Sequence, residues 1–109
     1  MPQTAADIAP LLSDLRNALQ NLYGDRLHSV VLYGSYARGE ATEQSDVDVM
    51  VVLHGTVNPM QEITRLVDIT YPLELETGHL ISVLPLAASD FKSQSKSLVQ
   101  QAHEKGVPV

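Results

Sequence analysis

The sequence has 109 residues, no cysteine and a formal net charge of −6, and no apolar run approaches the roughly 20 residues that span a bilayer. These properties exclude disulfide frameworks and thiolate metal sites. They also argue against binding of a long nucleic acid, because domains that grip its backbone are usually basic. The length fits a single domain, residues 1–109, which we expect in the cytoplasm and without membrane contact.

The first predicted element is an amphipathic helix that Gly24 ends. Thr4 and Asp7 form a capping pair before it, and Pro10 fits a first helical turn. We interpret its apolar stripe as core, or alternatively as an interface with a partner helix. The stripe consists of Ile8, Leu11, Leu12, Leu15, Leu19 and Leu22.

Two strands follow, joined by a short helix and a polar loop. Residues 27–33 predict a strand that is covered on both faces. A glycine breaks this strand, Ser35 opens a short helix through Arg38, and residues 39–45 form the loop. The second strand covers residues 46–53, and alternation places one set of its side chains on a common face: Val47, Val49, Val51 and Leu53.

The second half of the chain predicts a helix over residues 60–70, with Pro72 ending it. Its expected buried stripe is Ile63, Leu66 and Val67. Residues 73–76 alternate apolar and acidic side chains, which fits either a strand with one wet face or a frayed helix end.

A further strand over residues 79–86 leads to a last helix from Phe91 to Glu104, which Ser89-Asp90 caps and Gly106 stops. This order of helices and strands predicts an α/β (α+β) domain, with a small mixed central sheet flanked by helices.

Two acidic side chains stand at the start of the second strand. Asp46 and Asp48 are two residues apart, so they project from one face, about 6–7 Å apart along the strand. Like charges there repel each other and resist desolvation, and strands disfavour Asp. A divalent cation resolves the conflict, and hard oxygen ligands suit Mg²⁺. Without the residues that precede it, this pair would read as a solvated strand edge.

The turn after the first strand supplies the other half of a site. Gly34 lets the backbone turn sharply and approach a ligand, and Ser35 adds a hydroxyl beside the N–H groups that open the next helix. Arg38 offers a fork to phosphate, or pairs on the surface with Glu40 or Glu43; Ser45 is a weaker phosphate contact. Together these residues predict attack of a substrate oxygen on the α-phosphorus of a nucleoside triphosphate, with pyrophosphate leaving.

The segment Gly34-Ser35-Tyr36-Ala37-Arg38-Gly39, followed by Ser45-Asp46-Val47-Asp48, resembles the signature of the minimal nucleotidyltransferases, which belong to the DNA polymerase beta superfamily. The spacer between the glycine-serine pair and the Asp-x-Asp motif fits the family pattern, and the likeness extends loosely over nearly the whole chain. The resemblance implies the nucleotidyltransferase fold, metal ligands at Asp46 and Asp48, and nucleotide-phosphate contacts at Gly34 and Ser35. Arg38 matches the family's arginine, which contacts the nucleotide or stabilises the loop.

The resemblance also implies partners. Members of the family are often paired with a helical HEPN-domain protein encoded beside them, and several pairs are toxin–antitoxin systems that move AMP from ATP to a tyrosine of the toxin. We therefore expect a protein adenylyltransferase that uses Mg²⁺ and ATP, with a homo-oligomer as a further possibility.

Active relatives usually carry a third carboxylate on a nearby strand, acting as a metal ligand or as a base. Residues 79–86 contain no acid, so the candidates are Glu74, Glu76 or a replacement by His79. If none reaches the site, activity is weak or needs a residue from a partner. An inactive relative that neutralises a helical partner by binding is the alternative function, and an antibiotic-modifying transferase is a weaker one.

Two other residue types are interpreted as structural. The four histidines show no metal-ligand spacing and read as strand-end or surface residues. The four tyrosines read as packing residues, with Tyr36 singled out because it lies inside the motif.

Overall fold

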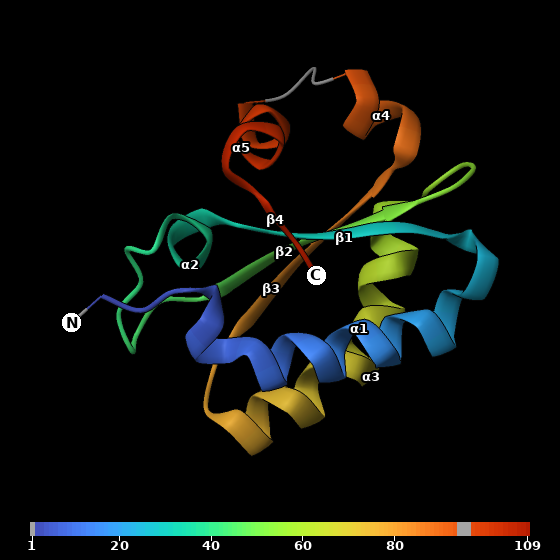
Figure 1. Ribbon diagram of the computed structural model, residues 1–109. Coiled ribbons are helices and arrows are strands. Elements are labelled where there is room, and N and C mark those ends of the chain that lie inside the picture. The colour runs from blue at the N-terminus through green and yellow to red at the C-terminus, as the bar shows by residue number, and fades with distance from the viewer. Residues whose placement is uncertain (1, 94–96) are drawn as a thin grey trace.

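The computed structural model describes residues 2–93 and 97–109, and a four-stranded mixed sheet lies at its centre (Figure 1). The strand order is β3-β2-β1-β4. β1 (Leu27–Tyr33) pairs antiparallel with β2 (Val47–Leu53) and with β4 (Val107–Pro108), whereas β2 pairs parallel with β3 (Ile81–Ala87). The predicted architecture, a small mixed sheet flanked by helices, is therefore confirmed.

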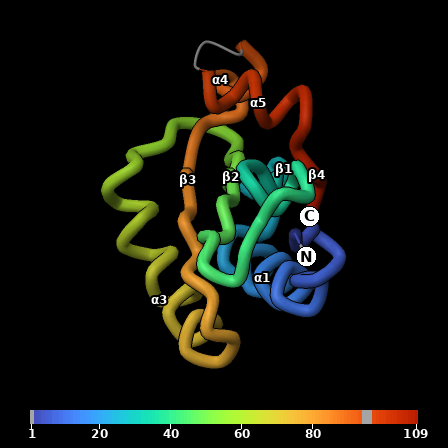
Figure 2. The backbone as a smooth tube through the Cα atoms, turned by 90° about the vertical axis from the view of Figure 1, so that its left-hand side faces the viewer, coloured from blue at the N-terminus to red at the C-terminus, as the bar shows by residue number. Residues whose placement is uncertain are grey.

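Helices cover both faces of the sheet, as the two views in Figures 1 and 2 show. One face packs against α1 (Ala9–Tyr23) and α3 (Pro59–Thr77), and the other lies under α4 (Ala88–Ser93) and α5 (Ser97–Lys105). The short helix α2 (Gly34–Arg38) follows β1 directly at one end of the sheet.

The side chains of β2 alternate between two hydrophobic cores. The predicted set, Val47, Val49, Val51 and Leu53, packs with α1 and α3. Met50 and Val52 pack instead under α4 and α5. Because side chains alternate along a strand, Asp48 points to the α4/α5 face.

The first helix begins and ends differently from its predicted form. Thr4 and Asp7 do form a capping box, but it starts a single 3-10 turn, Ala5–Ile8, that precedes α1. Leu22 is 43% exposed, and Tyr23 takes its place in the core. Tyr23 is buried because its ring turns toward α3, where its hydroxyl donates to Glu62.

The helix α3 continues past Pro72, so the prediction that this proline ends the helix is wrong. Pro72 removes one N–H and crowds the carbonyl of Asp68, but both residues are exposed, so that carbonyl can bind water. The helix ends instead at Gly78, whose φ is 75° and whose N–H donates to the carbonyl of Glu74. The strand alternative for residues 73–76 is therefore excluded.

The buried face of α3 is also rotated from the predicted one. Its buried residues are Glu62, Leu66 and Thr70, while Ile63 and Val67 are 38% and 51% exposed. A buried Glu62 is possible because it accepts hydrogen bonds from Tyr23 and Arg26. The outward face of α3 consequently carries exposed apolar side chains: Met60, Ile63, Val67, Tyr71 and Leu75.

The C-terminal region contains helices on both sides of residues 94–96. The predicted continuous helix 91–104 therefore has a centre that lies outside the described residues, and α4 begins at Ala88, so Ser89 and Asp90 do not cap it. Gly106 follows the end of α5, as predicted. The short β4 was not predicted, because its pairing with β1 is not encoded locally. No helix among the described residues has the length and apolar character needed to cross a membrane.

Candidate active site

A row of three paired residues crosses the sheet where β1 ends. Asp48 on β2 pairs with Tyr33 on β1 and with Ser82 on β3. Paired residues of adjacent strands project to the same side, so all three stand on the α4/α5 face. The next residue after Tyr33 is Gly34, so the glycine turn and the Asp-x-Asp motif meet at one end of the sheet.

Gly34 is in direct contact with the carboxylate of Asp48. Its φ is 75°, in the left-handed region that favours glycine. A Cβ at this position would overlap Oδ2 of Asp48 and lie 3.1 Å from Cγ. Position 34 therefore requires glycine for two reasons: its backbone conformation, and the space that the carboxylate of Asp48 fills.

The two acidic side chains of the motif influence each other electrostatically. Burial raises the pKa of Asp48, the charge of Asp46 raises it further, and Arg38 partly lowers it. Asp46 itself is exposed and immediately precedes β2. The structure thus keeps a half-buried carboxylate close to a like charge, an arrangement that a bound cation would stabilise.

The donor set fits a hard divalent cation such as Mg²⁺. Both side chains offer carboxylate oxygens. In the described part of the chain, no third His, Cys, Asp or Glu side chain joins them to form a larger metal-binding group. Mg²⁺ usually takes one or two carboxylates and completes its coordination with phosphate and water oxygens. Two carboxylates beside a turn open to a phosphate match that pattern.

The other predicted phosphate contacts, Ser35, Arg38 and Ser45, differ in whether their side chains already make hydrogen bonds within the chain. In residues 2–93 and 97–109 the hydroxyl of Ser35 makes no hydrogen bond. Arg38 donates through Nε to Glu40 at 3.1 Å, so the surface pairing considered from the sequence is present. The charge of Arg38 also lowers the pKa of Asp48. Ser45 accepts from the N–H of Thr42 at 2.9 Å and so holds the loop together.

A family model described as a nucleotidyltransferase domain matches residues 12–107, which include every element of this site. The chain belongs to the nucleotidyltransferase domain family. The resemblance read from the Gly-Ser and Asp-x-Asp motifs is thereby confirmed.

Two relatives of this nucleotidyltransferase come from Methanocaldococcus jannaschii and are named as protein adenylyltransferases. One, MJ0604, is 34% identical over 73 residues, which is 67% of this chain and 67% of the relative. The other, MJ0141, is 28% identical over 103 residues, which is 94% of this chain and 99% of the relative. The second match spans nearly the whole of both chains.

Solved structures share the fold of this nucleotidyltransferase. A toxin–antitoxin with AMP-PNP matches with a TM-score of 0.60 and 22% identity, covering 86% of this chain and 68% of that one. A protein named as a minimal nucleotidyltransferase matches with a TM-score of 0.57 and 24% identity, covering 90% of this chain and 92% of that one. At these identities the likeness establishes the fold.

The third carboxylate expected of an active nucleotidyltransferase does not come from the candidates named from the sequence. Glu74 lies on α3, and its Oε2 accepts from the N–H of Ile81 at 2.8 Å, while Glu76 is exposed on the same helix. His79 precedes β3, and its Nδ1 lies 3.4 Å from the hydroxyl of Tyr36. The position beside Asp48 belongs to Ser82.

The tyrosines and histidines of this nucleotidyltransferase are structural, with one exception among the tyrosines. Tyr23, Tyr33 and Tyr36 are buried as predicted, but Tyr71 is 57% exposed. The hydroxyl of Tyr36 donates to Gln3 at 3.1 Å, so this residue ties the motif helix to the N-terminal segment. The histidines lie at exposed or half-buried positions, as expected.

The sequence patterns did not predict a buried network of charged side chains around Glu62. Glu62 is 1% exposed, and its carboxylate accepts from Tyr23 at 2.9 Å, from Arg26 at 3.1 Å and from Arg65 at 3.4 Å. Burial by itself raises the pKa of Glu62, but the bonds from Tyr23 and Arg26 and the nearby cations outweigh it and hold the pKa below its usual value. No periodic signal marks such a residue, because Glu at an otherwise apolar helix position reads as surface.

Proposed function

We propose that this nucleotidyltransferase transfers AMP from ATP to a hydroxyl group of a protein, with Mg²⁺ held by Asp46 and Asp48. The observation that carries the proposal is the contact between Gly34 and the carboxylate of Asp48, because it joins a phosphate-binding turn to the acidic pair. The names of the two archaeal relatives support AMP and a protein acceptor. The AMP-PNP in the toxin–antitoxin of the same fold supports an adenine nucleotide.

The residues of the chain position the nucleotide. The backbone N–H groups after Gly34 and the free hydroxyl of Ser35 donate to phosphate oxygens, and the terminal nitrogens of Arg38 pair with a further oxygen. When bound, Mg²⁺ would neutralise phosphate charge and favour in-line geometry at the α-phosphorus. Asp46 and Asp48 would thus be metal ligands, not groups that react covalently.

Transfer forms one bond and breaks one. The acceptor oxygen bonds to the α-phosphorus, the bond from that phosphorus to the bridging oxygen breaks, and pyrophosphate leaves. The acceptor hydroxyl loses its proton to water or to a group of the acceptor protein, because β3 carries no acid beside Asp48. Positioning and charge neutralisation are therefore the main contributions of this chain.

We further propose that the acceptor is a helical HEPN-type toxin and that this chain is its antitoxin. The shared fold with a toxin–antitoxin supports this role. The exposed apolar side chains along α3 support a protein partner, because a row of large apolar residues on a helix commonly marks an interaction surface.

The test uses α-labelled ATP, Mg²⁺ and the purified product of the neighbouring gene. We expect label on that protein and a mass increase of one AMP, and we expect Asp46→Asn to abolish both. Asp14→Asn, at an exposed position on α1, is the matched control. Normal labelling by the Asp46→Asn variant would contradict the metal assignment.

A second candidate function is neutralisation of the partner by binding alone. Ser82 is the residue of β3 that pairs with Asp48, and β3 carries no acid that could serve as the third carboxylate, which favours this second function. Under this function Asp46→Asn leaves both complex formation and neutralisation unchanged, whereas Val67→Glu on the outer face of α3 weakens both. Leu98→Glu, an exposed apolar residue of α5 on the other side of the sheet, controls for the added charge.

A further inference from the structure

A cleft of about 450 Å³ opens between α2 and α5, beside the site. Gly34 lines this cleft and also contacts Asp48, so the cleft is continuous with the proposed phosphate turn. One wall comes from the end of β1 and from α2, and the other comes from the last turns of α5. The lining residues are Tyr33, Gly34, Ala37, Arg38, Gln101, Glu104 and Lys105.

The cleft has a surplus of cations in an acidic chain. The sequence has seven Lys and Arg residues against thirteen Asp and Glu, yet this cavity is lined by two cations, Arg38 and Lys105, and by one carboxylate, Glu104. Among the described residues Lys105 makes no ion pair, and Arg38 uses only Nε, toward an exposed Glu40. Both cations thus have donors available for an anion, and the amide of Gln101 offers another.

The position of Lys105 is fixed by packing on both sides. Val99 and Ala102 anchor α5 in the core over the sheet, and directly after the helix Val107 pairs with Leu32. The backbone of Lys105 is therefore held beside the cleft by the end of α5 and not by a free chain end. Pre-positioned donors of this kind favour binding, because less conformational freedom is lost.

A polyphosphate fits this lining better than a nucleoside does. A base would need an aromatic ring or an apolar wall to stack on, but Tyr33 is only 9% exposed and packs into the core. We propose that Lys105, Arg38 and Gln101 bind the β- and γ-phosphates of the nucleotide, the part that leaves as pyrophosphate. This inference rests on the proposed function, and it adds α5 to the nucleotide site.

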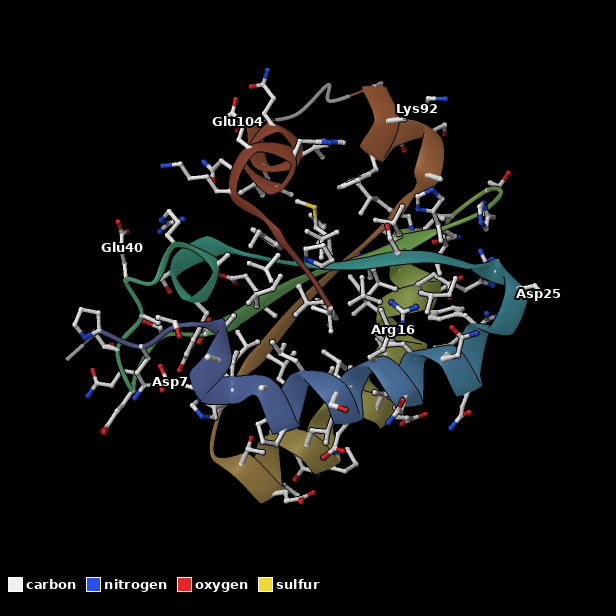
Figure 3. All side chains as sticks on the ribbon, viewed as in Figure 1. Asp7, Arg16, Asp25, Glu40, Lys92 and Glu104 are labelled. Carbon is white, nitrogen blue, oxygen red and sulfur yellow. The ribbon has the colours of Figure 1, made fainter. Side chains whose placement is uncertain are left out.

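The test is calorimetric titration of the full chain with ATP, pyrophosphate and AMP, each with Mg²⁺. We expect Lys105→Ala to weaken ATP and pyrophosphate binding roughly tenfold and to leave AMP binding within about twofold, because one charge-assisted contact to the tail is lost. Lys105→Arg should retain most of the affinity. Lys92→Ala on α4, which Figure 3 shows at the opposite end of this helical layer from Glu104, is the control and should change nothing.

Two results would overturn the inference. An equal loss of AMP affinity would assign the cleft to the nucleoside, and unchanged pyrophosphate affinity would leave Lys105 with only a helix-end role, visible as a lower Tm. The inference and the proposed function fail separately. If the wild type transfers AMP but Lys105→Ala binds pyrophosphate normally, only the inference is contradicted. If pyrophosphate binding depends on Lys105 but no AMP is transferred, only the proposed function is contradicted.

Discussion

The carboxylate of Asp48 on β2 occupies the space that a side chain at position 34 would need, so it fits against Gly34, the residue that directly follows β1. The polar loop between β1 and β2 lets the chain reverse direction, and the antiparallel register then brings Asp48 beside the residue that precedes Gly34. The spacing between the two motifs in the sequence is the length of this reversal.

The contact predicts that Gly34→Ala is more harmful than an ordinary glycine substitution. Gly55→Ala is the matched control, because Gly55 has a φ of 81° and open space around its Cα. We expect Gly55→Ala to lower the free energy of unfolding by about 1 kcal/mol through backbone strain alone. Gly34→Ala should lower it by roughly 3 kcal/mol, because overlap with Asp48 adds to the strain. Equal losses in urea unfolding would mean that Asp48 does not fill this space.

The raised pKa of Asp48 predicts a trade between stability and activity. Burial and the charge of Asp46 make the ionised carboxylate unfavourable in the folded chain. Asp48→Asn should therefore raise Tm at pH 7 in EDTA and lower AMP transfer at least about 100-fold. Asp14→Asn, exposed on α1, should change neither quantity. A lower Tm for Asp48→Asn would show that the carboxylate is part of the scaffold.

The Glu62 network predicts a pH-dependent contribution to stability. Because the folded pKa of Glu62 is lowered from 4.5, its stabilisation is complete above pH 4.5 and is lost as the pH falls through the folded pKa. Glu62→Gln should lower the free energy of unfolding by about 2–3 kcal/mol at pH 7, since charge-assisted bonds to Tyr23 and Arg26 are lost.

The difference between wild type and Glu62→Gln should shrink as the pH falls below 4.5, in urea unfolding curves taken at several pH values. Glu76→Gln on the exposed side of the same helix serves as control and should be neutral throughout. A difference independent of pH would mean that shape, and not charge, makes Glu62 stabilising.

The register of β3 predicts that an acid at position 82 would complete the site. Ser82 is exposed and pairs with Asp48 on the same face. Ser82→Asp should tighten Mg²⁺ binding roughly tenfold, because a third carboxylate adds attraction for the cation. It should also lower Tm in EDTA through repulsion with Asp48. The control Ser89→Asp, at an exposed position on α4, should leave the Mg²⁺ affinity unchanged. An unchanged Mg²⁺ affinity for Ser82→Asp would mean that position 82 lies away from the cation.

Sequence patterns that extend over only a few residues predicted much of the fold. Alternating valines predicted β2, the helical stripe predicted α1, and the two short motifs predicted the family. Prediction was poorer where neighbours in space decide. The rotation of α3 depends on which side chains meet Tyr23 and Arg26, and the length of α3 depends on solvent around Pro72.

The sequence by itself determined that Gly34, Ser35, Asp46 and Asp48 belong together, because strand alternation and turn chemistry act over two to four residues. Only the tertiary structure decided that Asp48 lies against Gly34, that Ser82 and not an acid pairs with Asp48, and that Lys105 lines the same cleft as Gly34. Strand register and helix packing join residues far apart in the chain, and no local pattern encodes that pairing.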